Sequence, residues 1–450
     1  MHRLALLVII FFAVLCSGLN AREPIVKAYY MYWSKASLPA TDLPWDDISH
    51  VANAFIWPNA NGSLVTAQAL HPELIAEAKA NDVKIIIAVG GWGQSDAFSG
   101  IAADPALRAT FIANLKAYCL QHGYDGVDLD WEYPRSADRA NVTLLIREMY
   151  EVFQEVDPPL GISIAMPSVD WQNGYDIPAI LDYIDWFGVM TYDFHGSWTD
   201  RSGHNSPLYS PSPAVCNTGS IHQSMQYYLQ RGVPRDKLLA GLASYGRRFN
   251  SSALCAGISS PVNNGAAVPY NEAVKLMEQG WTYHWDDASK VPWLMNADST
   301  RVVSFDDTVS FGRKADYIRE ENLRGAMVWA LGYDKTPEGH ALMQVLGAIR
   351  NTQTTAEPEH ETAADFKLMQ NYPNPFNPET IIRFELAEPG LVRLSVYDIL
   401  GRRLSTLIDG NRGAGLHAIR FDASTLNSGT YIYELELVGS RKTRKMILLR

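Results

Sequence analysis

Eight short β-rich runs, separated mostly by helical patterns, limit the folds open to this chain more than any other feature. Several runs are almost uninterrupted in apolar residues, for example residues 85–89 (IIIAV). Such runs are typical of parallel strands that helices cover on both faces of a sheet. The eight runs are Ile25–Trp33, Ile48–Ile56, Val83–Val89, Gly126–Trp131, Gly161–Met166, Trp186–Thr191, Leu238–Ser244 and Ala326–Leu331.

Strands that alternate with helices over about 320 residues predict an α/β fold, and eight of them predict a (β/α)8 TIM barrel. An open doubly wound sheet is the alternative interpretation, but no glycine-rich phosphate loop follows the first run. The segment between the seventh and eighth runs is too long for a simple crossover. We therefore expect a small α+β insertion there, at about residues 248–305.

The N-terminal residues differ in composition from the barrel region. A short basic start, an apolar run from Leu4 to Leu15 and small or polar residues up to Ala21 predict a secretory signal peptide over residues 1–21. The apolar run is too short to favour the alternative, a membrane anchor, and no later segment reads as a transmembrane helix. The chain is therefore expected to be secreted or held at the outer cell surface.

The C-terminal part of the sequence predicts a second domain. Residues 351–365 lack aromatic residues and periodicity, which indicates a linker and limits the barrel domain to residues 22–350. Residues 366–450 contain short alternating runs separated by turn residues, which predicts a small all-β, Ig-like sandwich. This tail holds none of the chain's 12 tryptophans, so a carbohydrate-binding sandwich is disfavoured.

Charge and cysteine content exclude some classes of function. The net charge of −11 argues against nucleic acid as a partner. No Cys/His cluster has the spacing of metal ligands, so we expect no metal and no other cofactor. Cys119 lies in an apolar helical pattern and is expected to be a buried thiol, whereas Cys216 and Cys255 lie in loop-like stretches. In an oxidising compartment a Cys216–Cys255 disulfide is a hypothesis, with free thiols as the alternative.

One run carries three acidic residues in strict alternation. In residues 125–132 (DGVDLDWE), Asp128, Asp130 and Glu132 share one face of a strand, and the apolar residues between them share the other. In a barrel the acidic face points inward, and Glu132 lies nearest the C-terminal mouth, where barrel enzymes carry out chemistry. Burial and mutual repulsion raise the pKa values of such a group, so at least one proton is retained near neutral pH. Glu132 is thus a candidate acid catalyst.

Two other interpretations of this run are a calcium loop and a solvated acidic strand. Calcium loops are curved and contain glycine, whereas here branched and aromatic residues alternate with the acids. A solvated strand would not place three apolar residues on its other face. We therefore favour catalysis.

The acidic run resembles the DxxDxDxE signature of glycoside hydrolase family 18, which includes chitinases and related endo-β-N-acetylglucosaminidases. The resemblance covers residues 25–348 and includes Lys84 and the segments 90–92 (GGW), 190–193 (MTYD), 245–247 (YGR) and 327–330 (MVWA). Ala88 stands where the family often has a serine that holds the first inner aspartate. We therefore expect a looser hydrogen-bond network around Asp128.

The resemblance implies substrate-assisted hydrolysis with retention. Glu132 would protonate the glycosidic oxygen, and the substrate's 2-acetamido carbonyl would attack C1. Asp130 would hold the acetamido N–H, Asp128 would share a proton with Asp130, and Tyr192 would hydrogen-bond the acetamido oxygen. The substrate-binding residues that the resemblance implies are Tyr29, Phe55, Trp92, Met190, Asp193, Tyr245, Arg247 and Trp329.

The function that the resemblance implies is a secreted chitinase that acts on chitin or on β-1,4-linked N-acetylglucosamine oligosaccharides. An endo-β-N-acetylglucosaminidase that cuts glycoprotein glycans is the first alternative. A non-catalytic chitin-binding lectin is the second, although such lectins usually lack the terminal acid that is present here as Glu132. The tail, with residues 371–378 (NYPNPFNP), resembles the C-terminal sorting domain of the type IX secretion system, which implies the secretion machinery as a partner.

Overall fold

The computed structural model describes residues 23–211, 216, 218–337, 339–351, 366–371, 373–386, 389–398, 402–437 and 440–449. The predicted signal peptide, and the predicted linker after its first residue, lie outside the described residues. The chain forms two compact units, residues 1–355 and 356–450, each with an apolar core of its own.

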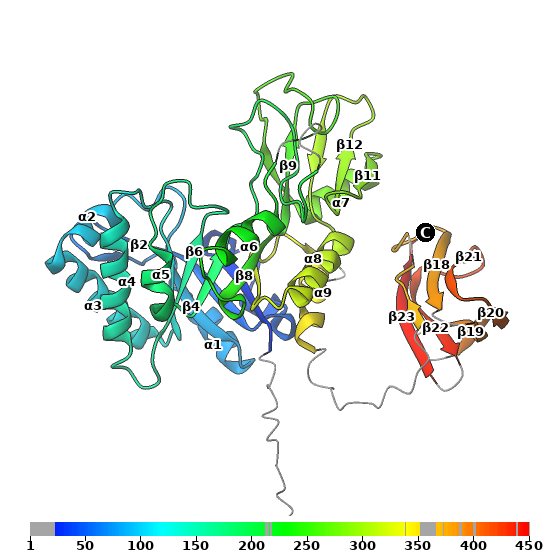
Figure 1. Cartoon of the computed structure of the whole chain (residues 1–450), viewed down its shortest axis with the longest axis horizontal. Helices are drawn as coiled ribbons and strands as arrows, with labels where there is room; N and C mark the ends of the chain where they lie inside the picture. Colours follow the sequence, from blue (N-terminus) through cyan, green and yellow to red (C-terminus); the bar gives the residue numbers. More distant parts are fainter. Residues whose placement is uncertain are drawn as a thin grey trace, which may run out of the picture. The chain divides into compact units, whose positions relative to one another are not determined.

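A closed barrel of eight parallel strands forms the centre of the first unit (Figure 1). In their order around the barrel, the strands are β1 (Ile25–Met31), β2 (His50–Pro58), β4 (Lys84–Gly90), β5 (Gly126–Asp130), β6 (Gly161–Met166), β7 (Trp186–Val189), β8 (Leu238–Ala243) and β14 (Gly325–Trp329). Strand β1 pairs with both β2 and β14, which closes the sheet. The TIM barrel is therefore confirmed and the open doubly wound sheet is excluded. The short β3 (Leu64–Val65) pairs antiparallel with β2.

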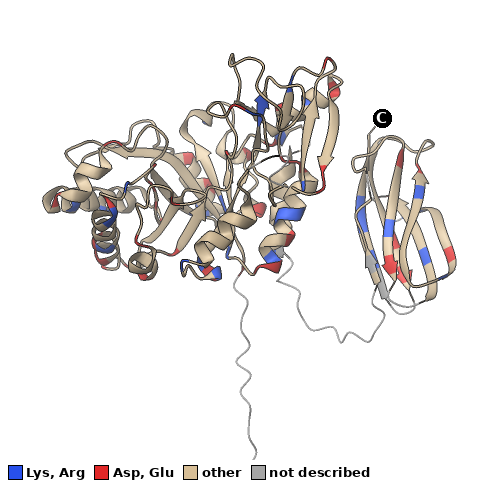
Figure 2. Cartoon of the chain, turned by 45° about the horizontal axis from the view of Figure 1, so that its top comes forward, with Lys and Arg blue, Asp and Glu red and all other residues tan. Residues whose placement is uncertain are grey.

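Side chains of the barrel strands alternate between two cores. In β1, Val26 and Ala28 belong to the cluster that joins strands to helices, whereas Tyr29 and Met31 belong to a smaller cluster inside the barrel. Acidic and basic residues lie along the surrounding helices (Figure 2). The helices are α1 (Pro72–Ala80), α2 (Phe98–Ala103), α3 (Pro105–His122), α4 (Arg139–Phe153), α5 (Ile177–Ile180), α6 (Ile221–Leu229), α8 (Thr308–Glu320) and α9 (Ala341–Asn351), with 3-10 turns η1 (Tyr32–Ser34), η2 (Ala40–Asp42), η3 (Trp45–Asp47), η4 (Leu181–Tyr183) and η5 (Arg235–Lys237).

Helix α3 illustrates how local sequence sets the helix bounds. The Asp104 side chain accepts hydrogen bonds from the backbone N–H groups of Ala106 and Leu107, and Pro105 occupies the first helical position. The helix ends at Gly123, which adopts a left-handed conformation with a φ of 78°. Across the described ranges, none of the helices combines the length and the apolar character needed to cross a membrane.

A five-stranded antiparallel sheet lies between β8 and β14 in the chain, together with helix α7 (Tyr270–Glu278) (Figure 1). Its strands, in spatial order, are β10 (Ala266–Pro269), β9 (Tyr245–Phe249), β13 (Val302–Ser304), β12 (Val291–Met295) and β11 (Thr282–Asp286). Strand β9 begins two residues after β8 ends, so its first residues stay at the C-terminal mouth of the barrel. A two-stranded hairpin of β15 (Lys335–Thr336) and β16 (Gly339–His340) follows β14.

The second unit consists of antiparallel strands in two sheets, in agreement with the predicted all-β tail. The sheets are β17 (Phe366–Leu368), β18 (Glu379–Leu386) and β21 (Gly415–Asp422), and β20 (Arg403–Arg412), β19 (Gly390–Asp398), β22 (Gly429–Leu437) and β23 (Ser440–Leu448). In β18 the buried Ile382, Phe384 and Leu386 alternate with more exposed residues and join one apolar cluster. Sequence analysis did not anticipate β17, whose three residues are too few to show a period.

Cys216 and Cys255 form a disulfide, which confirms the hypothesis from the sequence. The disulfide joins the segment between β7 and α6 to the inserted sheet region. Hydrogen bonds reinforce this connection, because Ser202 donates its backbone N–H to Ala256 at 3.0 Å and Ile258 donates to Asp200 at 3.0 Å. Cys119 is buried and is the free cysteine of the described residues.

Replacing both Cys216 and Cys255 by serine is expected to lower the free energy of unfolding by about 3–4 kcal/mol. The disulfide closes a loop with a sequence separation of 39, and opening it returns that loop entropy to the unfolded chain. Thermal unfolding of the variant against the parent chain measures the loss. Thiol titration of the unfolded, unreduced, exported chain should give one thiol, from Cys119, and three thiols would contradict the disulfide.

Candidate active site

The carboxylate run forms β5 and its immediate continuation, and it alternates as the sequence predicts. Val127 and Leu129 pack in the cluster between strands and helices, while Asp128 and Asp130 are buried on the other face. Glu132 lies two residues beyond the end of β5 and is only partly buried. The column of three acids therefore runs from the barrel interior to its mouth.

The end of β4 approaches β5 closely through Gly90. A Cβ atom at Gly90 would lie 2.2 Å from the Asp130 carbonyl oxygen, and its φ of 109° disfavours any other residue. The backbone N–H of the next residue, Gly91, donates to the same carbonyl at 2.7 Å. The glycine pair thus fixes where Asp130 sits in the barrel.

A cleft of about 800 Å³ opens at the C-terminal ends of the barrel strands. Asp130 and Glu132 lie in its wall, whereas Asp128 is fully buried beneath it. Tyr192 and all the substrate-binding side chains that the resemblance implies also line the cleft, and these are Tyr29, Phe55, Trp92, Met190, Asp193, Tyr245, Arg247 and Trp329.

Asp128 is held firmly, so the expected loosening around it is wrong. Ala88 is its direct partner on β4 and offers no hydrogen bond, as the sequence suggested. The donors come from other strands instead. Tyr29 donates its hydroxyl to Oδ2 at 2.5 Å, Lys27 donates to Oδ1 at 2.6 Å, and Ser163 on β6 also donates to Oδ1.

Asp130 differs from Asp128 in that its buried Oδ1 atom has no hydrogen-bond partner. Burial is the main cause of a pKa well above the usual range for this carboxyl, and the charges of Glu132 and Asp128 raise the pKa further, while Lys27 opposes the shift. An unpaired buried carboxyl oxygen at the wall of a cleft is suited to accept a hydrogen bond from a bound ligand.

Glu132 has the properties of an acid that is partly protonated near neutral pH. Burial is the largest cause and raises the pKa of its carboxyl to about 7, with a hydrogen bond from Tyr133 acting against the shift and Asp193 adding to it. The Glu132 backbone N–H donates to the Ser95 hydroxyl at 3.0 Å, which fixes the chain at this point.

Asp193 is tied down by two neighbours from β9. Tyr245 donates its hydroxyl to Oδ1 at 2.7 Å, and Arg247 donates to both carboxylate oxygens, at 2.9 and 2.7 Å. Arg247 also donates to the Gly265 carbonyl at 2.9 Å. This bidentate pair joins the inserted sheet to the end of β7 and uses most of the hydrogen-bonding capacity of Asp193.

Aromatic rings form the floor of the cleft around Trp329. Its ring stacks on Phe55 with centroids 5.7 Å apart and an interplanar angle of 20°, and Tyr29 lies 5.3 Å away. Tyr192 stands beside Tyr245, with burial as the main cause of a pKa well above the usual tyrosine range, so its hydroxyl stays protonated and can donate. Trp92 is 79% exposed at the rim.

Sequence analysis missed several side chains of the cleft. Trp33, Trp171 and Trp198 line it and are largely exposed, although tryptophan usually buries its ring. Trp198 follows the MTYD segment by five residues, so a tryptophan in a loop after a strand end was the available signal. Lys27 was also missed, although a lysine inside an otherwise apolar strand was visible in the sequence.

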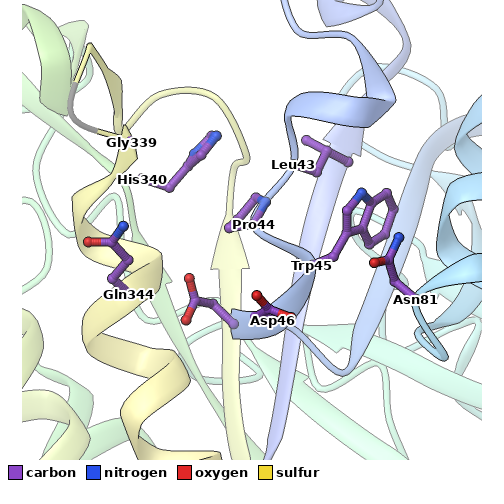
Figure 3. Close-up of a pocket in the computed structure, with 9 residues that line it drawn as sticks. Leu43, Pro44, Trp45, Asp46, Asn81, Gly339, His340 and Gln344 are labelled. Atoms are coloured by element: carbon purple, nitrogen blue, oxygen red, sulfur yellow. The ribbon is translucent and has the colours of Figure 1, made fainter.

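A second cavity, of about 290 Å³, shares no lining residue with the cleft. Its lining includes Asp46 from the segment before β2, His340 from β16 and Gln344 from α9 (Figure 3). His340 is held between the Asp334 carboxylate and the Asp42 carbonyl oxygen. No group of His, Cys, Asp and Glu residues suited to hold a metal ion occurs within the ranges that the structure describes.

The family model for glycosyl hydrolases family 18 matches residues 26–334. The chain belongs to this family. A second model, for a secretion system C-terminal sorting domain, matches residues 370–449, which confirms the assignment of the tail.

Two curated relatives of the chain and one similar solved structure are chitinases by name. Chitinase A1 of Niallia circulans is 35% identical over 315 residues, which is 63% of this chain and 44% of that protein. A probable endochitinase of Caenorhabditis elegans is 32% identical over 322 residues, 64% of this chain and 51% of that protein. The chain thus spans about half the length of these relatives. The crystal structure of the Ostrinia furnacalis Group IV chitinase with allosamidin is 30% identical, with a TM-score of 0.65, and the match covers 74% of this chain and 100% of that one.

Proposed function

We propose that this protein is a chitinase that hydrolyses β-1,4 linkages between N-acetylglucosamine units, with Glu132 as the acid and base. The observation that carries the proposal is the placement of the Glu132 carboxyl at the cleft wall, next to the buried Asp130. Burial there raises the pKa of Glu132 to about 7. An acid of that strength is partly protonated at neutral pH and can give its proton to a leaving oxygen.

The lack of a free second carboxylate supports substrate assistance. An ordinary retaining glycosidase needs a carboxylate nucleophile about 5 Å from its acid. Among the described acids that line the cleft, Asp193 is engaged by Tyr245 and Arg247. Asp130 is the remaining one, and its orphaned oxygen suits a hydrogen-bond acceptor for the substrate's amide.

The proposed reaction then has two steps. Glu132 protonates the glycosidic oxygen as the C1–O bond breaks, and the substrate's acetamido oxygen attacks C1 to give a cyclic oxazolinium. Asp130 accepts the amide N–H and stabilises the positive charge that develops on this ring, while the Tyr192 hydroxyl directs the acetamido oxygen. Glu132, now ionised, takes a proton from water, which attacks C1 and restores the acetamido group with net retention.

A panel of three substrates tests this proposal. The full chain is incubated with N-acetylglucosamine oligomers, with cello-oligosaccharides of the same length and with a high-mannose glycopeptide. The products are identified by mass spectrometry. We expect cleavage of the first only, because cellulose fragments lack the acetamido nucleophile. Cleavage of the glycopeptide alone would favour an endo-β-N-acetylglucosaminidase, and binding without cleavage would favour a lectin.

The rate should fall as pH rises above about 7. Glu132 must be protonated in the free enzyme, and burial holds its pKa at about 7, so the active fraction drops about tenfold for each pH unit above that value. The measurement is kcat/KM on a chitin oligosaccharide from pH 4 to 10 at constant ionic strength. A rate that stays level to pH 9 would contradict the assignment of Glu132 as the acid.

We also propose that the sorting domain delivers the chain to the outside of the cell. The match over residues 370–449 and the basic and apolar N-terminal sequence support export. Deleting residues 366–450 is then expected to trap the protein inside the producing cell, as judged by its distribution between cells and medium.

A further inference from the structure

Lys27 is buried inside the barrel, below the carboxylate column. It lies on β1, two residues before Tyr29 and on the same face of the strand. Its side chain is fully buried, and so is that of Asp128, whose Oδ1 lies 2.6 Å from the ammonium nitrogen. The same nitrogen lies 3.4 Å from the Tyr29 hydroxyl. A lysine in such a place needs a counter-ion, and Asp128 supplies it.

The neighbouring strands β7 and β2 leave space for the Lys27 ammonium and place no further charged side chain beside it. On β7, a Cβ atom at Gly188 would lie 2.6 Å from the Met327 sulfur and 3.4 Å from the lysine nitrogen, so glycine leaves room here for both side chains. On β2, His50 pairs with Lys27 in register, and burial, with Lys27 as the next cause, lowers the pKa of this histidine to about 3. His50 is therefore neutral near neutral pH.

Among the described residues, the β5 carboxylates of Asp128 and Asp130 and the Tyr29 hydroxyl are the other titratable groups that interact with Lys27. Lys27, Tyr29 and Ser163 all donate to Asp128, and the Lys27 ammonium can only donate. This arrangement suits an ionised Asp128 and differs from the expectation that Asp128 shares a proton with Asp130. Asp130, one layer higher, must ionise beside that fixed negative charge to stabilise an oxazolinium.

We propose that Lys27 is a positioning residue of the reaction, whose ammonium holds Asp128 as a carboxylate and offsets its charge so that Asp130 can ionise when substrate is bound. The inference rests on the proposed function, because it assigns Lys27 a part in that chemistry. Lys27 touches neither the cleft nor the substrate and acts through Asp128 and Asp130. The opposing effect of Lys27 on the raised pKa of Asp130 has the sign that the proposal requires.

The test measures the effect of the Lys27 charge in two variants that both carry asparagine at position 128, so that residue 128 has no proton to gain or lose. Asp128→Asn and the double variant Lys27→Met/Asp128→Asn are compared as full chains by the pH profile of kcat/KM on a chitin oligosaccharide. Without the nearby cation, Asp130 holds its proton more tightly, whereas burial is the main cause of the raised pKa of Glu132. The limb of the pH profile that follows ionisation of Asp130 is therefore expected about one pH unit higher in the double variant than in Asp128→Asn.

A matched control comes from a second buried pair outside the cleft, Lys314 and Asp306, whose side chains are each 1% exposed. Comparing Asp306→Asn with Lys314→Met/Asp306→Asn makes the same chemical change at a distance. The proposal is supported if the pH profile shifts between the two Asp128→Asn chains and stays the same between the two Asp306→Asn chains. It is overturned if the two Asp128→Asn chains have the same pH profile, or if the Asp306→Asn chains show an equal shift.

A second measurement does not depend on catalysis. In Asp128→Asn the ammonium has lost its counter-ion, and a buried unpaired cation destabilises the fold. The Tm of Asp128→Asn should therefore lie below that of the double variant at pH 6. Equal Tm values would overturn the charge assigned to Lys27. If the parent chain cleaves no substrate, the proposed function is wrong. The Tm comparison still tests whether Lys27 is charged, because it does not depend on activity.

Discussion

Replacing Glu132 by glutamine is expected to lower kcat on chitin oligosaccharides by about 10³- to 10⁴-fold. The proposed reaction uses this carboxyl twice, first to protonate the leaving oxygen and then to activate water, and a positioned general acid or base contributes about 10²- to 10⁴-fold to a rate. Glutamine has nearly the same shape but neither gives nor takes the proton. The measurement is initial-rate kinetics on the purified parent and variant chains.

A substrate with a better leaving group distinguishes loss of the acid catalyst from a general disruption of the active site. An aryl glycoside of N-acetylglucosamine oligomers expels a phenolate that needs little help from a proton, so its bond cleavage should suffer less than that of the natural linkage. Glu155→Gln is a matched control, since Glu155 is exposed and forms a surface ion pair with Lys116 at 2.8 Å. Equal losses on both substrates would contradict the role of Glu132 as the acid.

The same substitution should leave the fold intact and make it more stable in alkali. The pKa of Glu132 is raised to about 7 in the folded chain, above its ordinary value of about 4.3. The stability that the protonated form gives is fully present below about pH 4.3 and is lost as pH rises through about 7. The Tm of Glu132→Gln relative to the parent should therefore increase over that interval.

The parts of the fold that the sequence predicts are those whose pattern is local. The parallel strands could be placed because each is a short apolar run between helical patterns, and the run at residues 85–89 became the centre of β4. The acidic face of β5 was predicted because a strand alternates its side chains, whatever surrounds it. The disulfide could only be offered as a hypothesis, from the loop character of both cysteines and the expected compartment, and the structure decides for it.

The parts that could not be predicted depend on contacts between distant residues. The loss of a hydroxyl at Ala88 predicted a weakly held Asp128, but Ser163 and Lys27 replace it from strands far away in the sequence. The exposed rings of Trp171 and Trp198 lie in loops, where no period separates a core residue from one that lines a cleft. Only closure of the barrel brings these side chains together.

Replacing Asp130 by asparagine is expected to change activity and stability in opposite directions. The rate should fall about 10²- to 10³-fold, because an amide oxygen still accepts the substrate N–H but carries no charge to oppose the developing oxazolinium. Burial is the main cause of the raised pKa of Glu132 and is unchanged by this substitution, so the fall in rate above about pH 7 should persist in the variant. Kinetics across pH on parent and variant chains measure both effects.

The stability of Asp130→Asn should exceed that of the parent at neutral pH by on the order of 1–2 kcal/mol, since the buried carboxyl has an unpaired oxygen and two acidic neighbours. The folded pKa of Asp130 lies well above the unfolded value of about 3.9, so the parent loses stability as pH rises from that value through its folded pKa. The advantage of the variant should thus be small at pH 4 and larger at pH 7. A buried carboxyl that serves the substrate lowers the stability of the fold, and an amide in its place does not. If the variant lost both rate and stability at pH 7, Asp130 would instead be a residue that stabilises the barrel.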